Sequence, residues 1–212
     1  MAGAKEQWPT SGLKTEKLIW FADAIFGFSI TLLAMDIRAP TTLVGTDLPS
    51  ALVALMPRIN SFLISFWIVG SYWIGYHRMF SYIVRYDRGL IYLNLLFLMF
   101  IVLLPFPADL IGRYYTETIS LLIGAVFFAS TGISLALLWR HASSDHRLVD
   151  KRLDQRTIRL ISRRNIVSPI VFIASIPFFF LTSFLAPSIS PFKQFIWLIL
   201  LPLFAIVDRR YK

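Results

Sequence analysis

Four polar side chains lie inside apolar stretches of the sequence, where each is costly to place. Asp23 interrupts the stretch FADAIFGFSITLLAMD (21–36), Trp73 and His77 are four residues apart in a second apolar stretch, and Asn94 lies in a third. An ionisable group inside lipid is a functional candidate, and histidine can titrate near neutral pH. Two chemistries are open for an Asp23–His77 pair: a hydrogen-bonding anchor between helices, or a proton relay.

A second pattern follows along the stretch that contains Asp23. If this stretch is helical, Phe28, Thr31 and Met35 lie within about 60° of one another, whereas Asp23 is displaced from Phe28 by about 140°. Asp23 and the Phe28 stripe therefore face different neighbours. Spacing alone fits a buried or lipid-facing stripe as well as one that borders an open space.

The elements that must position these residues are membrane-spanning helices. The chain has 212 residues, of which 57% are hydrophobic and 16% charged, and its mean hydropathy is +0.66. Such a composition is typical of proteins whose solvent is lipid. Six stretches approach the length of about 20 apolar residues that a helix needs to cross the hydrocarbon core. We therefore predict an all-α, polytopic membrane protein, a single transmembrane domain over 1–212 with spans near 18–37, 50–77, 90–111, 117–139, 166–185 and 191–207.

The distribution of Lys and Arg predicts the orientation. Most of the 21 basic residues lie before the first span, in 78–88, in 140–165 and after the last span. By the positive-inside rule, both termini are expected in the cytoplasm of a cell, with the protein in the cell membrane. The segment 140–165 is expected to be a basic cytoplasmic loop, although a helical extension or a segment lying on the anionic leaflet also fits its weak helical spacing.

Several function classes find no support in the sequence. The net charge of +9 is explained by membrane topology rather than by nucleic acid, so no nucleic-acid partner is expected. The absence of Cys excludes disulfides and thiolate metal sites. His77, His141 and His146 are scattered, and no metal-ligand spacing, nucleophile elbow or catalytic carboxylate pair is present. We expect no enzyme activity, metal site or cofactor.

Three motifs resemble a known family in order and spacing. KLIWFAD (17–23) resembles the RxxxFSD signature on the first helix of the transmembrane protein 175 family of potassium channels. SFWIVGSYWIGYHRMF (65–80) and NLLFLMFIVLLPF (94–106) are similar to the next two segments of that family. Lys17 stands where the family has Arg, and Ala22 where it has Ser. Because lysine cannot make the bidentate contacts of guanidinium, we expect an altered or weaker network around the motif.

The resemblance implies a fold, an assembly and a set of site residues. The prokaryotic members of this family are similar six-helix subunits that assemble as homotetramers, with the first helix of each subunit lining the pore. Carried over by distance from Asp23, the hydrophobic constriction falls on Phe28 and Met35, and the threonine that contributes to cation selectivity falls on Thr31. Phe28 stands where the family usually has Ile or Leu. The motif and helix-packing network is assigned to Lys17, Phe21, Asp23, Trp73, His77 and Asn94.

These observations predict a homotetrameric cation channel that is permeable to potassium ions and surrounded by membrane lipids. A TVGYG-type filter is absent, so selectivity is expected to depend on the narrow apolar ring and on the Thr31 hydroxyls. Asp36 is expected at the pore mouth, unless it only pairs with Arg38 at the helix end. The alternative is a proton-conducting or proton-coupled membrane protein that uses an Asp23/His77 relay.

Overall fold

The computed structural model describes residues 13–39, 47–185 and 187–209 as an assembly of helices. The elements are α1 (Leu13–Met35), α2 (Leu48–Phe80), α3 (Arg88–Leu103), α4 (Pro105–Arg113), α5 (Thr118–Ser143), the short 3₁₀ helix η1 (Ser144–His146), α6 (Gln155–Leu185), the 3₁₀ segment η2 (Pro187–Ile199) and α7 (Leu200–Arg209). The predicted all-α fold is confirmed, and within the described ranges strand pairing is limited to one bridge between Ile83 and Val149.

Within the ranges that the structure describes, five helical stretches are long and apolar enough to cross a membrane: 15–35, 48–80, 88–113, 118–146 and 155–185. The third combines α3 and α4, which are separated at Leu104 because Pro105 and Pro107 cannot donate backbone hydrogen bonds. A sixth, shorter apolar helical segment covers 193–204 and runs through η2 and α7. The six expected spans therefore correspond to five long helices and one shorter segment that is partly 3₁₀ helix.

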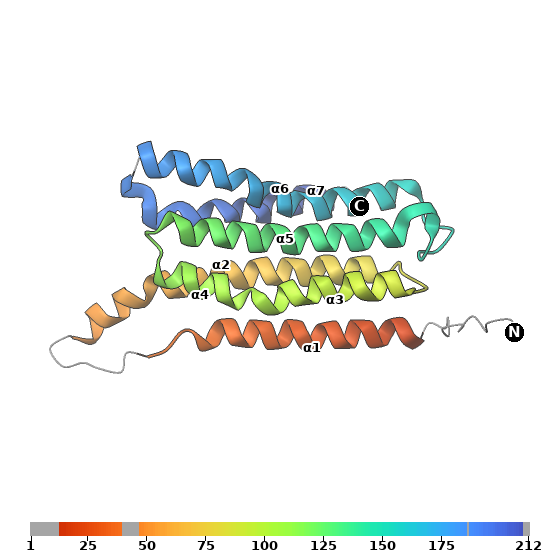
Figure 1. Cartoon of the computed structure of the whole chain (residues 1–212), viewed down its shortest axis with the longest axis horizontal. Coiled ribbons are helices and arrows are strands. Elements are labelled where there is room, and N and C mark those ends of the chain that lie inside the picture. Colours follow the sequence, from red (N-terminus) through yellow and green to blue (C-terminus); the bar gives the residue numbers. More distant parts are fainter. Residues whose placement is uncertain (1–12, 40–46, 186, 210–212) are drawn as a thin grey trace, which may run out of the picture.

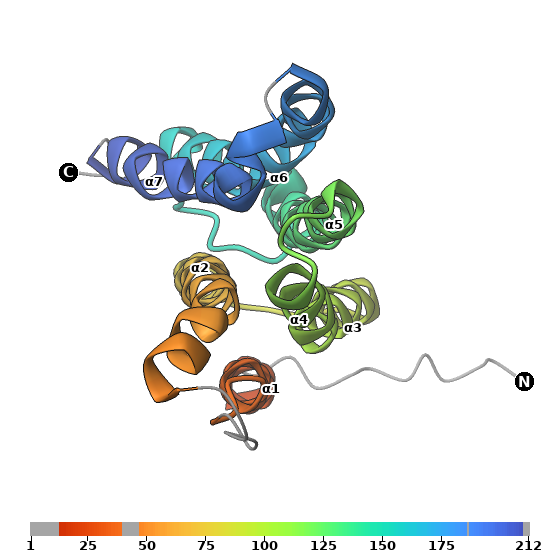
Figure 2. The ribbon, with the colours of Figure 1, turned by 90° about the vertical axis from the view of Figure 1, so that its left-hand side faces the viewer.

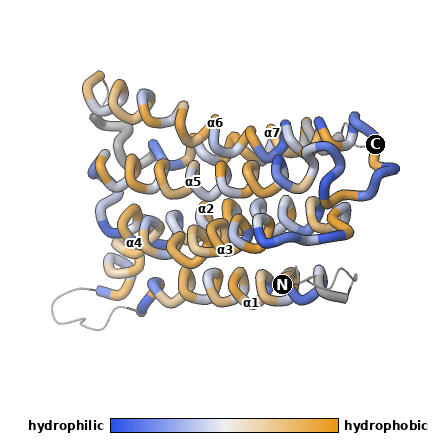
Figure 3. Tube along the Cα trace, turned by 45° about the vertical axis from the view of Figure 1, so that its right-hand side comes forward, coloured by the Kyte–Doolittle hydropathy of each residue, from blue (hydrophilic) through white to orange (hydrophobic). Residues whose placement is uncertain are grey.

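The helices lie side by side along the long axis of the molecule (Figure 1). α5 packs closely against α6 and also contacts α3 and α4, whereas α1 lies at the edge of the bundle against α2, α3 and α4 (Figure 2). Hydrophobic residues run along the middle of the helices and hydrophilic ones gather toward the two ends (Figure 3). This distribution suits a bundle that crosses a membrane along its long axis.

One end of the bundle gathers the connections that carry most of the positive charge. α1 begins there, and the α2–α3 and α5–α6 connections lie at that same end in Figure 1. The two connections pair with each other, because the backbone N–H groups of Val84 and Arg85 both donate to the carbonyl of Leu148, at 3.0 and 3.2 Å. We call this the basic end.

The segment 140–165, which the sequence suggested as a basic loop, is largely helical. α5 continues to Ser143 and α6 begins at Gln155, so the connection is confined to 144–154. Ile158 and Ile161 are buried, and helical packing of these side chains extends α6 beyond its apolar span. Arg164 is also buried, within 2.7 Å of the position that a Cβ on Gly75 would occupy, and its guanidinium lies 4.9 Å from the ring centre of Phe204. Arg164 thus belongs to the helix packing and not to a solvated loop.

Candidate functional site

The carboxylate of Asp23 ties α1 to α2. Trp73 Nε1 donates to Asp23 Oδ1 at 2.8 Å, and His77 Nε2 lies 2.7 Å from the same oxygen. Trp73 and His77 reach one acceptor because they are one helical turn apart, with their ring centres 4.5 Å from each other. The side chains of Asp23 and His77 are 39% and 34% exposed in the single chain. The three residues form a hydrogen-bonded cluster at the side of the bundle.

Asn94 lies beside this cluster, without a direct contact to Asp23. Its Oδ1 accepts a 3.0 Å hydrogen bond from the hydroxyl of Tyr76, a residue between Trp73 and His77 on α2. The Tyr76 ring stacks on Phe97, with ring centres 5.6 Å apart. Sequence reasoning missed Tyr76, which joins α2 to the buried Asn94 on α3; its position one turn before Phe80 on an aromatic face was the available signal.

The Phe28 stripe faces away from the rest of the chain. Phe28 is 59% exposed and Met35 is 64% exposed, and Thr31 between them is exposed as well. The Thr31 hydroxyl donates to the Phe28 carbonyl at 2.7 Å. Because this bond uses the hydrogen, the lone pairs of the Thr31 oxygen stay available as acceptors. The stripe therefore presents two apolar side chains and a hydroxyl acceptor to the exterior of the chain.

The exposed stripe is longer than spacing around Phe28 alone indicated. Lys17, Phe21 and Ala24 are exposed and continue the stripe toward the start of α1. The opposite face is buried against α2, α3 and α4. Lys17 and Phe21, assigned by resemblance to the Asp23 network, lie on this outer face in the structure. The whole stripe comprises Lys17, Phe21, Ala24, Phe28, Thr31 and Met35, an alternation of four- and three-residue steps.

This 4-3-4-3-4 spacing is that of a seam along which helices pack around a common axis. The signal was present in the sequence as a heptad-like repeat, but the opposite face of α1 is equally apolar. Ala22, Phe26 and Leu33 on that face are all at most 2% exposed. Hydropathy therefore could not tell the packed face from the outer one.

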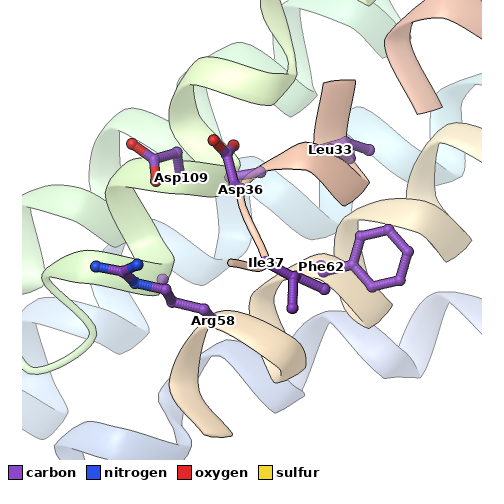
Figure 4. Close-up of a pocket in the computed structure, with 8 residues that line it drawn as sticks. Leu33, Asp36, Ile37, Arg58, Phe62 and Asp109 are labelled. Atoms are coloured by element: carbon purple, nitrogen blue, oxygen red, sulfur yellow. The ribbon is translucent and has the colours of Figure 1, made fainter. Parts of the chain in front are cut away.

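Asp36 lies just past the end of α1, in a cluster of mixed charge. Together with Asp109 and Arg58 it lines a cavity of about 10 Å³ (Figure 4). Burial and the nearby Asp109 carboxylate raise the pKa of Asp36, although Arg113 and Arg38 act in the opposite direction. Asp36 is thus near several charges at the end of α1, and Arg38 is only one of the basic groups that act on it.

A further charged cluster, which the sequence did not reveal, lies at the basic end. Asp87 caps α3 by accepting from the Leu90 N–H at 2.7 Å, and it also contacts His141 Nε2 at 2.9 Å and Arg147 at 2.9 Å. Burial acts to raise the pKa of Asp87, but the Leu90 N–H, His141 and Arg147 together lower it below the ordinary value. His141 fits there because residue 89 is glycine. A Cβ added at this position would lie 2.7 Å from the imidazole of His141. An Asp after a short loop predicts a helix cap, but its long-range partners could not be read from spacing.

Among the residues that the structure describes, no group of three or more His, Asp or Glu side chains is arranged to hold a metal ion. The polar side chains of the site instead join helices to one another. Around Phe28, the outer face of α1 offers the apolar side chains of Phe28 and Met35 and the hydroxyl of Thr31 as an acceptor.

Comparison with known proteins places this geometry in context. Residues 17–105 match the family described as endosomal/lysosomal potassium channel TMEM175. A potassium channel of Streptomyces collinus is 34% identical over 143 residues, which is 66% of this chain and 69% of that protein. The endosomal/lysosomal proton channel TMEM175 of Danio rerio is 23% identical over 172 residues, which is 81% of this chain and 33% of that protein.

The fold also matches a solved structure. The crystal structure of a lysosomal potassium-selective channel TMEM175 homolog from Chamaesiphon minutus superposes with a TM-score of 0.73 and 25% sequence identity. The match covers 88% of this chain and 97% of that chain. The similarity therefore extends well beyond the three motifs on the first spans.

Proposed function

This chain belongs to the TMEM175 family of ion channels, and from that membership we propose that it forms a homotetrameric, potassium-permeable channel with α1 lining the pore. The observation that carries the proposal is the outer stripe of α1. This mainly apolar face has no partner within the described part of the chain, and copies of α1 around a common axis would account for it. A single helix cannot enclose a path for ions, so closed symmetry among several subunits is required.

Phe28 and Met35 form the constriction in this arrangement. In a tetramer, the four copies of each residue would form one circle of apolar side chains around the pore axis. A narrow apolar circle of this kind controls ion flow by excluding water. Thr31 lies between the rings with its hydroxyl hydrogen directed to the Phe28 carbonyl at 2.7 Å. Four Thr31 oxygens would then offer acceptors to a partly dehydrated cation, which is the interaction that selectivity requires here.

The two ends of the stripe bear opposite charges. Lys17 lies on the same outer face as Phe28, at the basic end, and Asp36 follows Met35 at the other end. With both termini in the cytoplasm of a cell, as the positive-inside rule favours, cations would meet Asp36 at the outer mouth and Lys17 at the inner mouth. The negative charge of the Asp36 carboxylate attracts cations, and the nearby positive charges of Arg58 and Arg113 reduce that attraction.

The proposal is tested by the reversal potential of the purified protein in planar bilayers. At equal pH on both sides and a tenfold potassium gradient, the reversal potential is expected to follow the potassium equilibrium potential. A reversal potential near zero under that gradient would contradict potassium selectivity. Phe28→Ser in the same bilayers should raise the conductance and weaken the discrimination between potassium and sodium.

A second candidate, a proton-conducting protein, is favoured by one contact. Asp23 Oδ1 and His77 Nε2 are 2.7 Å apart and both side chains are partly exposed, which suits proton transfer between an acid and an imidazole. The family also contains relatives named as proton channels. A reversal potential that follows a pH gradient at equal potassium, and that is lost in His77→Ala, would establish this function in place of the first.

A further inference from the structure

A large cavity lies between α5 and α6 at the basic end, and the channel proposal assigns it no role. Its volume is about 740 Å³. One side of each helix lines it, with lining residues spread between Ile133 and His146 and between Gln155 and Ile173. This is the range of volumes that drug-sized organic ligands occupy in proteins, about 300–1,000 Å³. α1 does not line the cavity, and Figure 2 shows α6 on the side of the bundle away from α1. A ligand here would lie away from the outer stripe of α1.

The part of the cavity away from the α5–α6 connection is an open apolar groove. Leu137 on α5 and Ile166, Ile170 and Ile173 on α6 line it, and each is between 43% and 57% exposed. The isoleucines follow one another at four- and three-residue steps, so they form one stripe along α6. At 1.5 Å per residue this stripe is about 10 Å long. Its direction along the helix axes matches that of an acyl chain in a bilayer.

The end of the cavity nearest the α5–α6 connection is polar and positively charged. Arg140 lines it together with hydroxyls of Ser143 and Ser144. Arg140 is exposed and has no ion pair among the residues that the structure describes. Asp145 is the acid in this lining, and it lies in a left-handed turn (φ 49°) with His146 (φ 52°).

A neighbouring hollow of about 590 Å³ shares Leu137, Arg140, Ser144 and Asp145 with this cavity, and its lining adds His141 and Arg147. Arg147 is partly neutralised by its 2.9 Å contact with Asp87, so Arg140 is the main basic group without an ion pair where the two hollows meet, with the exposed Asp145 as the acid on the same lining. The surrounding sequence 148–163 contains five further Lys and Arg and only two Asp, which makes the local field positive.

We propose that this cavity binds an anionic phospholipid from the membrane leaflet at the basic end, with one acyl chain along the α6 isoleucines and the phosphate at Arg140. A basic pocket between membrane helices, open to an apolar groove, has the two features that a phospholipid headgroup and its chain require. Free phosphate would use only the first feature, and a zwitterionic lipid would gain little from the charge. The site does not depend on the permeant ion.

Native mass spectrometry of the full-length protein, released from nanodiscs that contain equal phosphatidylglycerol and phosphatidylcholine, tests the proposal. We expect retained phosphatidylglycerol to exceed phosphatidylcholine by about tenfold, the ratio that one charge-assisted contact of about 1.4 kcal/mol provides. Arg140→Gln should abolish this preference. The matched control is Arg85→Gln, an exposed arginine at the same end that does not line the cavity.

A second variant tests the apolar half of the site while leaving every charge in place. Ile170→Trp fills the groove and should reduce retained phosphatidylglycerol several-fold, with thermal stability in detergent unchanged. Equal retention of the two lipids, or equal losses in Arg140→Gln and Arg85→Gln, would overturn the proposal, since either result indicates only a diffuse surface charge. Full displacement of the lipid by inorganic phosphate alone would overturn the role of the acyl chain.

Discussion

Helices α1 and α5 have nearly the same length and hydropathy but very different surroundings. Their most apolar stretches are similarly hydrophobic, yet 22% of that stretch in α1 and 56% of that stretch in α5 is buried. α5 is packed against α3, α4 and α6, whereas one face of α1 has no neighbour among the residues that the structure describes. Hydropathy therefore indicates that both helices lie in the membrane, without distinguishing a helix packed on several sides from one that keeps an exposed face.

The largest effect is expected from truncating a phenylalanine on α5. Phe128 is fully buried, and its ring centre lies 5.1 Å from that of Phe172 and 5.3 Å from that of Trp197. Phe128→Ala should lower the free energy of unfolding by about 3–5 kcal/mol because it leaves a cavity in the core. Phe28→Ala, at a side chain 59% exposed, should change it by less than about 1 kcal/mol.

Thermal unfolding of both variants in the same detergent measures this difference. Equal losses of stability would show that the outer face of α1 is packed in the isolated subunit, and the contrast between the two helices would be wrong.

A pair of glycines repeats the comparison with a smaller change. A Cβ on Gly132 of α5 would lie 2.7 Å from Cδ of Pro169, whereas a Cβ on Gly27 of α1 would have no atom within 4 Å. In Gly132→Ala, overpacking should lower the free energy of unfolding by about 1–3 kcal/mol. The higher helix propensity of alanine should offset about 1 kcal/mol of this loss. Gly27→Ala should leave the subunit unchanged or stabilise it slightly. Melting curves check both variants, and a loss of stability in Gly27→Ala alone would reverse the assignment of the two faces.

Asp87 anchors the end of α5 through His141, and its contribution should depend on pH. Because the pKa of Asp87 in the folded protein is below the ordinary value of 3.8, the stabilisation is present above pH 3.8 and is lost as the pH falls through the lowered pKa. Asp87→Ala removes a helix cap and should cost about 1–2 kcal/mol at neutral pH. The melting temperatures of the variant and the parent should differ by a constant amount above pH 3.8 and approach each other as the pH is lowered below it. A difference that stays constant with pH would mean that the charge of Asp87 contributes nothing.

The smallest effect is expected at the attachment of α1. Asp23 joins α1 to α2 through hydrogen bonds to Trp73 and His77 that are partly exposed, so Asp23→Asn should cost about 1 kcal/mol. We expect a modest loosening of the oligomer, visible as a shift toward smaller species in detergent sizing. The control is Asp109→Asn, which leaves the α1–α2 contact intact. Wild-type sizing and stability in Asp23→Asn would contradict the anchoring role of this cluster.

The sequence was informative where one local pattern decides the structure. Apolar length predicted the spans, and the i, i+4 spacing of Trp73 and His77 correctly indicated side chains on one face of α2. The partners of Asp87 lie far along the chain, so no local pattern could identify them. Arg164 looked like one more loop charge, because its burial depends on Gly75 in another helix leaving room for the guanidinium.

The outer face of α1 shows a different limit. Ala22, Phe26 and Leu33 are as apolar as Phe28 and Met35, so the direction in which α1 packs follows from the shapes of α2, α3 and α4 rather than from its own residues. The role of Phe28 came from the family resemblance and stays a prediction. What the structure adds is that the Phe28 side chain is exposed in the single chain.

The most direct test of the central claim, that the outer face of α1 lines the ion path, compares two phenylalanines of equal exposure. Phe28 on α1 and Phe180 on α6 are both 59% exposed in the single chain. Single-channel conductance in planar bilayers should rise several-fold in Phe28→Asn and stay at the parent value in Phe180→Asn. Unchanged conductance in Phe28→Asn, or an equal rise in both variants, would contradict a pore lined by α1.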